Sequence, residues 1–193
     1  MSEQSSGGFP VRIIGGAIYG AIAFAGSFLA VVALYLQRAR ESGADLPQAL
    51  EKMEGEEHLP DLAGWIFYNA HTVDVAITVS RFGGSETQTL NLVGEPWISD
   101  TTIFHAIPAG FLFVAGFIVA MRTPHRIDLV SGALAGASVT IGYGALAYFG
   151  TTFFSASEMG MAVAPAMPDS LYIVALAYPV VAGGAAGALR GLL

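Results

Sequence analysis

Acidic and histidine side chains gather in one stretch of the sequence, and these residue types can bind divalent cations. The stretch holds Glu56, Glu57, His58, Asp61, His71 and Asp74. Carboxylate oxygens and imidazole nitrogens would suit a metal ion, but their spacing matches no recognised metal-binding loop. If Val73–Val79 forms a strand, His71 and Asp74 also point to opposite faces. We therefore expect a solvated acidic surface and no metal site.

His105 is the second group that could do chemistry, because it lies near the start of a strongly apolar segment, three residues before Pro108. A histidine inside a membrane helix can ligate haem or relay protons. Haem ligation usually needs a second axial ligand, and no other long apolar segment of this chain contains histidine. We expect His105 to hydrogen-bond a neighbour at the level of the membrane interface.

The remaining catalytic signatures are missing from the sequence. The chain has no cysteine, so neither a disulfide framework nor a thiolate metal site is available. It also lacks a P-loop, a dinucleotide fingerprint, a nucleophile elbow and a zinc-protease motif. The sequence therefore predicts a non-enzymatic protein with no catalytic residue and no cofactor, and no nucleic-acid partner.

Membrane-spanning helices are the main elements that the sequence predicts. Of 193 residues, 54% are hydrophobic and only 12% are charged, which is too apolar for an ordinary soluble domain. Four segments have the length and composition of a spanning helix, namely 11–36, 99–122, 128–149 and 169–190. We predict an all-α, four-helix membrane protein with a disordered tail at 1–10 and a small α+β insertion, residues 37–98, between the first two helices.

The insertion is acidic and is predicted to contain short helices followed by a β-hairpin. Leu46–His58 has helical composition, and a second short helix could begin with Asp61 as its N-cap. Apolar and polar residues then alternate along Val73–Val79, and Gly83–Ser85 supplies turn residues, which together predict a hairpin over 73–93. Open strand edges cannot lie in lipid, so we expect the hairpin to stay outside the membrane.

The rival interpretation is a fifth spanning helix from Leu62 to Ser80. It would place Asp74 in the bilayer, where an aspartate costs about 2.5 to 3.5 kcal/mol on insertion scales. Four spans with cytoplasmic termini in the cell membrane make the insertion and the loop 150–168 extracellular. The positive-inside rule then places Arg12, Arg122, Arg126 and Arg190 inside but leaves Arg38 and Arg40 outside, which five spans would repair. We favour four spans because of the hairpin.

Glycines recur every four residues in three of the predicted spans. Such spacing lets helix backbones approach closely where lipid gives no hydrophobic drive for association. Packing within one chain and contact between chains both remain open at this point. The candidate helix-packing residues are Gly16, Gly20, Gly132, Gly136, Gly183 and Gly187.

The composition and one short motif carry a resemblance. An acidic, cysteine-free chain that favours arginine over lysine resembles the proteins of extremely halophilic archaea. The run WIFYNAH, Trp65–His71, resembles a W-x-F-Y-N-A-H motif of uncharacterised haloarchaeal multi-pass membrane proteins. This resemblance implies a membrane protein and brings no known activity with it.

Two functions fit the sequence. The first is an accessory or structural subunit, or a homo-oligomer, that recognises a membrane-protein partner through its extracellular insertion. The second is a small passive channel or transporter subunit. Ion-coupled transport is poorly served, because the uncharged cores of the four spans, residues 13–36, 103–121, 129–149 and 171–189, contain no Asp, Glu, Lys or Arg. The side chains expected to contact a partner are Trp65, Phe67, Tyr68, His71, Ile77, Phe153 and Phe154.

Overall fold

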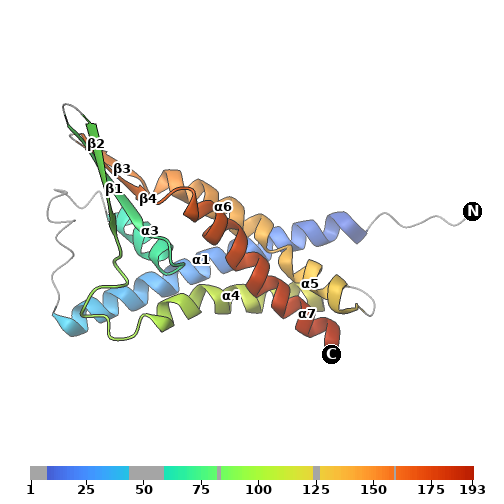
Figure 1. Ribbon diagram of the computed structural model, residues 1–193. Coiled ribbons are helices and arrows are strands. Elements are labelled where there is room, and N and C mark those ends of the chain that lie inside the picture. Colours follow the sequence, from blue (N-terminus) through green and yellow to red (C-terminus); the bar gives the residue numbers. More distant parts are fainter. Residues whose placement is uncertain (1–7, 44–58, 82–83, 124–126, 159) are drawn as a thin grey trace, which may run out of the picture.

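A computed structural model shows how the chain folds, and it describes residues 8–43, 59–81, 84–123, 127–158 and 160–193 (Figure 1). The helices are α1 (Gly8–Ser42), α3 (Leu59–Asn69), α4 (Thr102–Met121), α5 (Leu129–Ala137), α6 (Thr140–Phe153) and α7 (Gly184–Leu192). Two π-helical stretches, η2 (Ser170–Ala177) and η3 (Pro179–Gly183), lead into α7. The strands are β1 (Val75–Arg81), β2 (Gly84–Leu90), β3 (Ala156–Glu158) and β4 (Met161–Pro165).

Four helical segments among the described residues are long and apolar enough to cross a membrane. They are Ile13–Ser42, Thr102–Met121, Leu129–Phe153 and Ser170–Leu192, so the third combines α5 with α6 and the fourth combines η2, η3 and α7. The prediction of four such helices is confirmed. The fifth span is not formed, because α3 has 11 residues and ends at Asn69 before β1 begins at Val75.

Several predicted boundaries differ from the structure. Residues 8–10 belong to α1 and not to a disordered tail, and the same helix continues past the predicted end of the first span to Ser42. Asp61 lies in the first turn of α3, which begins at Leu59, and is therefore not its N-cap. The surface helix predicted at Leu46–His58 lies entirely outside the described residues.

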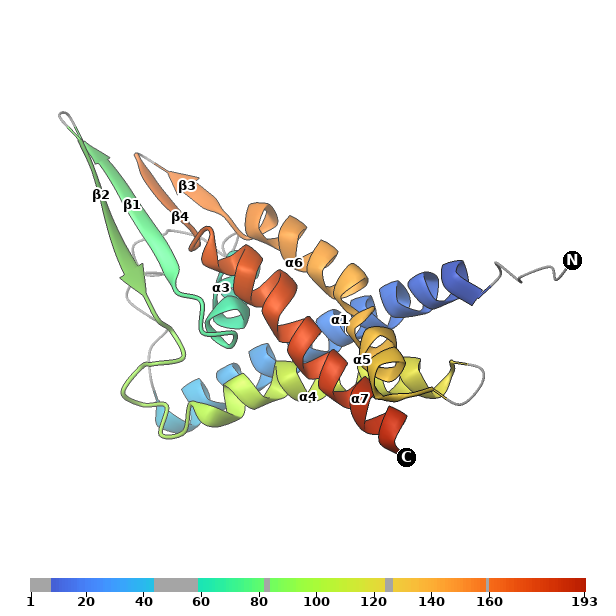
Figure 2. The same cartoon turned by 45° about the vertical axis from the view of Figure 1, so that its right-hand side comes forward.

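The spanning helices form two pairs that converge at one end of the molecule and diverge at the other (Figure 2). One pair is α1 with α4, and the other is α6 with η2; α4 also contacts η3 and α7. Both chain termini lie towards the converging end (Figure 1). At the diverging end α3 lies between the pairs, and the sheet extends outwards from there (Figure 2).

Glycines allow the close approach of the helices at the converging end. A Cβ atom on Gly132 would overlap the backbone of Gly187, and one on Gly136 would overlap that of Gly183. These four residues therefore join α5 to the fourth spanning segment. Gly16 and Gly20 of α1 meet the backbone at Ser138 and Val139 in the same way. All six candidate packing glycines thus lie at contacts between helices of one chain.

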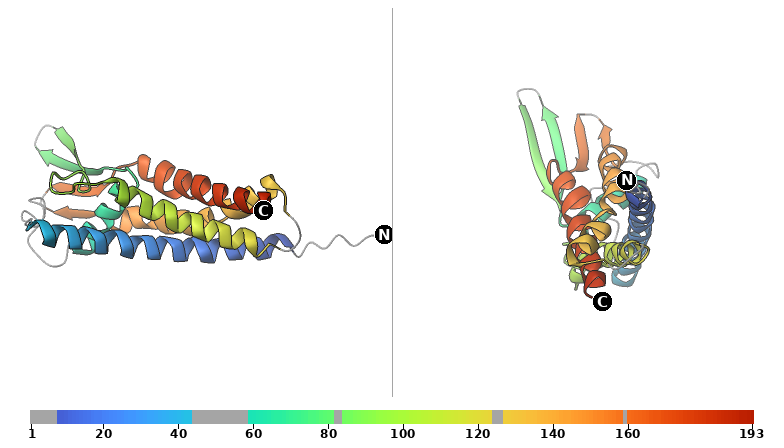
Figure 3. Two further views of the ribbon diagram at one scale, coloured as in Figure 1. Left: turned by 90° about the horizontal axis from the view of Figure 1, so that it is seen from below. Right: turned by 90° about the vertical axis from the view of Figure 1, so that its right-hand side faces the viewer.

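The four strands form one antiparallel sheet in the order β2-β1-β4-β3. The hairpin predicted at 73–93 is confirmed as β1 and β2. The loop predicted as extracellular, 150–168, supplies a second hairpin, β3 and β4. Strand β4 of this hairpin pairs with the edge of β1 that β2 leaves free. The sheet is therefore built from two distant parts of the sequence and not from the insertion alone (Figure 3).

The alternating apolar residues of Val73–Val79 share one face, and this face is buried only near the base of β1. Val73 and Val75 are fully buried, whereas Ile77 and Val79 are partly exposed. The side chain of Thr78, on the opposite face, bonds Thr87 of β2 with a distance of 3.1 Å between the two hydroxyl oxygens. The sheet thus begins in the protein core and ends in a partly exposed tip.

Replacing Gly136 with alanine tests the close helix contact. We expect the new methyl group to force the backbones of α5 and η3 apart and to destabilise the protein by about 1–3 kcal/mol, a loss of several degrees in melting temperature. The matched control is Gly110→Ala in α4, because a Cβ there meets no atom within 4 Å. Thermal unfolding in detergent measures both variants, and equal melting temperatures would contradict the packing.

Candidate functional site

The run Trp65–His71 is the most completely buried stretch of the described chain that carries polar side chains. Each of its seven residues is at most 1% exposed, and four of them have polar side-chain atoms. The first five belong to α3 and the last two to the turn that follows it. Buried polar atoms require hydrogen-bond partners, so the partners of this run define how it is held.

Two of these side chains bind the backbone of α6 and the residue after it. The indole Nε1–H of Trp65 donates to the carbonyl oxygen of Phe154 at 2.8 Å. The hydroxyl group of Tyr68 donates to the carbonyl oxygen of Ala147. Burial raises the pKa of Tyr68 above its ordinary value, so this hydroxyl remains a donor. Both bonds fix α3 against the third spanning segment.

Asn69 and Ala70 connect the same run to two further segments. The Asn69 side chain donates to the carbonyl oxygen of Val73 and accepts from the backbone N–H of Leu92, each at 2.7 Å. His105 of α4 donates through Nδ1 to the carbonyl oxygen of Ala70 at 2.9 Å. The prediction that His105 hydrogen-bonds a neighbour is confirmed. These bonds tie the turn to both ends of the hairpin and to α4.

His71 is fully buried, with a hydrogen bond at each ring nitrogen. Nδ1 lies 2.8 Å from the carbonyl oxygen of Phe67 and Nε2 lies 2.6 Å from the hydroxyl oxygen of Tyr143. Since a carbonyl can only accept, Nδ1 carries the proton and Nε2 accepts from Tyr143. The Tyr143 oxygen in turn lies 3.5 Å from Oγ of Ser27 in α1. His71 thereby links the turn to two spanning helices.

The environment of His71 favours the neutral imidazole. The residue lies in the turn after α3, outside the four apolar helices. Burial is the main reason that its pKa is lowered from 6.5 to about 4, and nearby His105 lowers it further, while the bond to Phe67 acts in the opposite direction. The neutral, buried histidine joins the turn after α3 to the helices around it through its two hydrogen bonds.

Among the described residues, the structure does not bring the possible metal ligands together. His71 is buried with both ring nitrogens engaged, whereas the carboxylate of Asp74 accepts from Asn91 at 3.1 Å. The described residues contain no group of three or more His, Asp or Glu side chains that could hold a metal ion. Glu56, Glu57 and His58 lie outside the described residues.

The predicted partner contacts divide into buried and exposed residues. Trp65, Phe67, Tyr68 and His71 are enclosed within the chain, which corrects the expectation that they touch a partner: their apolar surface packs on other helices instead. Phe154 is only 8% exposed, but its neighbour Phe153 is 71% exposed. Of the seven candidates, only Phe153 and the partly buried Ile77 offer surface to another molecule.

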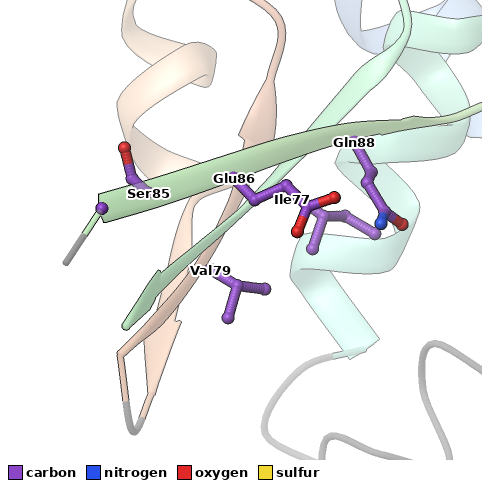
Figure 4. A pocket seen from close by; sticks show the side chains of 6 residues that line it. Ile77, Val79, Ser85, Glu86 and Gln88 are labelled. Carbon is purple, nitrogen blue, oxygen red and sulfur yellow. The ribbon is translucent and has the colours of Figure 1, made fainter. Parts of the chain in front are cut away.

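An exposed groove on the sheet is the second feature of interest, and sequence reasoning found only part of it. It has a volume of about 360 Å³ and is lined by Ile77, Val79, Gly84, Ser85, Glu86 and Gln88. Ile77 pairs with Gln88 and Val79 with Glu86, so these four side chains share one face of the sheet (Figure 4). The hairpin register, once known, would have identified Glu86 and Gln88.

Lowering the pH tests the environment of His71. Below pH 6.5 the histidine of the unfolded chain binds a proton, whereas folded His71 does so only near pH 4. The stability that depends on neutral His71 is therefore complete above pH 6.5 and is lost between pH 6.5 and 4, by up to about 1.4 kcal/mol per pH unit. Melting temperatures across this range should fall less steeply for His71→Phe than for the unchanged protein. Parallel curves would contradict a buried neutral histidine.

Comparison with known proteins gives a family without an assigned activity. No curated protein and no solved structure matches the chain. One family model covers almost its whole length, residues 2–193, and is described as a family of unknown function. The helices, the sheet and the buried run Trp65–His71 all lie within the matched region. The chain therefore belongs to DUF7978, a family of unknown function.

Proposed function

We propose that the protein is a non-enzymatic, multi-pass protein of the cell membrane whose sheet recognises a partner outside the cell. The helix bundle anchors the chain, and α3 holds the sheet at one end of it. The observation that carries the proposal is the contrast between these two parts. The polar groups of the buried run are engaged within the chain, whereas the outer strand of the sheet is exposed.

The distribution of arginines supports cytoplasmic termini. Arg122 at the end of α4 and Arg190 in the last turn of α7 belong to the end of the bundle where both termini lie (Figure 1). The positive-inside rule assigns such an end to the cytoplasm. Arg38 and Arg40 lie at the sheet end of α1, where Arg38 pairs with Glu41 at 3.3 Å. The sheet would then be extracellular.

The filled interior supports recognition over conduction. Trp65, Phe67, Phe104 and Tyr143 are fully buried between the helices, and Phe67 contacts both Phe24 and Phe28 through its ring. Aromatic side chains thus occupy the space between the diverging helix pairs. A passive channel would therefore need a path between several copies of the chain.

Cysteine labelling tests the orientation, because the natural chain contains no cysteine. Ser85→Cys lies on the exposed strand β2, and Leu193→Cys is at the C-terminus, where the leucine is 82% exposed. On intact cells, a membrane-impermeant maleimide should label only the first variant, and both should react after permeabilisation. Labelling of Leu193→Cys alone would invert the orientation, and labelling of both would place the sheet and the C-terminus on the same side.

Native mass spectrometry tests recognition itself. The gently extracted protein should appear in a complex heavier than the 20.0 kDa chain. Thr87→Lys in the exposed strand should release the partner, whereas Leu134→Ala on a lipid-exposed position of α5 should retain it, since Leu134 is 70% exposed and far from the sheet in the chain. The mass of a single chain for the unchanged protein, or a complex that survives Thr87→Lys, would contradict recognition through the sheet.

A further inference from the structure

We propose that the end of the bundle where both chain termini lie binds the headgroup of an anionic phospholipid through the guanidinium groups of Arg122 and Arg190. This inference goes beyond the proposed function, because it needs helices that cross a membrane and no partner at the sheet. Three observations carry it: the distribution of charge, the common depth of the two arginines and the geometry of Arg122.

Charge in the membrane-spanning part of the chain is mostly positive, although the whole chain has a formal net charge of −7. Residues 8–36, 102–149 and 170–193 contain four arginines, one aspartate and no lysine or glutamate, namely Arg12, Arg122, Arg126, Asp128 and Arg190. All five belong to the start of α1, the connection from α4 to α5 or the last turn of α7, at the end of the bundle where the termini lie (Figure 1). The carboxylate of Asp128 accepts from the backbone N–H of Ser131 at 2.7 Å and forms no ion pair with a described arginine. This end therefore carries an excess of positive charge.

Arg122 and Arg190 lie at about the same depth in the bundle. The helix α4 and the segment η2–η3–α7 both run from the sheet towards the chain termini (Figure 1). They touch where a Cβ atom on Gly116 would overlap the backbone of Gly183. At about 1.5 Å per residue, Arg122 lies about 9 Å beyond this contact along α4, and Arg190 lies about 10 Å beyond it along α7. Arg122 directly follows the apolar span Thr102–Met121 and Arg190 is in the last turn of its span, so both lie at the level of the lipid headgroups.

The guanidinium group of Arg122 is held in position but is not neutralised. Its central carbon lies 5.0 Å from the centre of the Tyr19 ring in α1. A ring that covers one face of a guanidinium group leaves the N–H groups at its edge free, and two of these match two oxygens of a phosphate. No described residue forms an ion pair with Arg122 or Arg190. A negatively charged phosphate group would therefore compensate both arginines.

The depth of the two arginines selects a lipid headgroup as the occupant, because headgroup phosphates lie where a membrane span ends. A zwitterionic headgroup also carries an ammonium group, which the arginines repel, so an anionic lipid is preferred. The arginines could instead attract the negative membrane surface without a defined contact. These two roles differ in a measurable way, since lysine preserves the charge of Arg122 but not its planar arrangement of donors.

Lipid binding to the full-length protein, purified in detergent and freed of lipid, tests the proposal. The probes are dioleoyl phosphatidylglycerol and, as the zwitterionic control, dioleoyl phosphatidylcholine, and native mass spectrometry measures the affinity for the first bound molecule of each. We expect phosphatidylglycerol to bind about tenfold more tightly, and Arg122→Lys and Arg190→Gln each to weaken its binding about fivefold. Arg38→Gln removes the same charge at the sheet end of α1 and should change the affinity less than about twofold.

Equal binding of the two lipids, or an equal loss of affinity with Arg38→Gln, would overturn the headgroup site. Unchanged affinity of Arg122→Lys would contradict a defined contact and leave only a diffuse attraction between charges. Displacement of phosphatidylglycerol by an excess of inorganic phosphate would identify a soluble anion as the occupant instead. For each variant, the rise in melting temperature with phosphatidylglycerol is measured against its own lipid-free state, which separates lost binding from lost stability. The sheet takes no part in these measurements, so their failure would not contradict recognition through the sheet.

Discussion

The arrangement of this protein depends on the burial of α3 between helices that are themselves long and apolar. A segment placed in such surroundings has to satisfy its polar groups without water, since each unsatisfied group costs several kcal/mol. The run Trp65–His71 meets this requirement with side chains that bond the backbone of α6, the turn before β1 and the segment after β2. The run Trp65–His71 therefore determines where α3 lies in the bundle as well as how deeply it is buried.

The position of α3 determines where the sheet begins. The turn after α3 is held by Asn69 and His105, and Val73 and Val75 then enter the core at the base of β1. At the opposite end, glycine contacts such as that of Gly136 with Gly183 hold the helices close together. The helices converge at one end, where the glycines allow close contact, and they separate at the sheet end, where α3 packs between them (Figure 2).

The sequence predicts those features that follow from local periodicity and composition. The four apolar helices, the β1–β2 hairpin and the packing glycines fall into this group. The pairing of β4 with β1 depends on a contact between residues almost ninety positions apart, such as Ile77 with Val163, and no local pattern reveals it. The sequence predicts the aromatic residues of α3 as partner contacts, and this is wrong because a short apolar helix has the same composition whether a partner or its own chain covers it. Only the partners of Trp65 and His71 distinguish the two.

Trp65 allows the central claim to be measured directly, because the chain has two tryptophans and Trp97→Phe leaves Trp65 as the only one. Its fluorescence in a lipid bilayer can be quenched from water by iodide and from the membrane by brominated lipid. An α3 enclosed by the bundle predicts blue-shifted emission that neither quencher reduces appreciably, consistent with a side chain that is 1% exposed. Efficient quenching by either agent would place α3 on the surface and contradict the account.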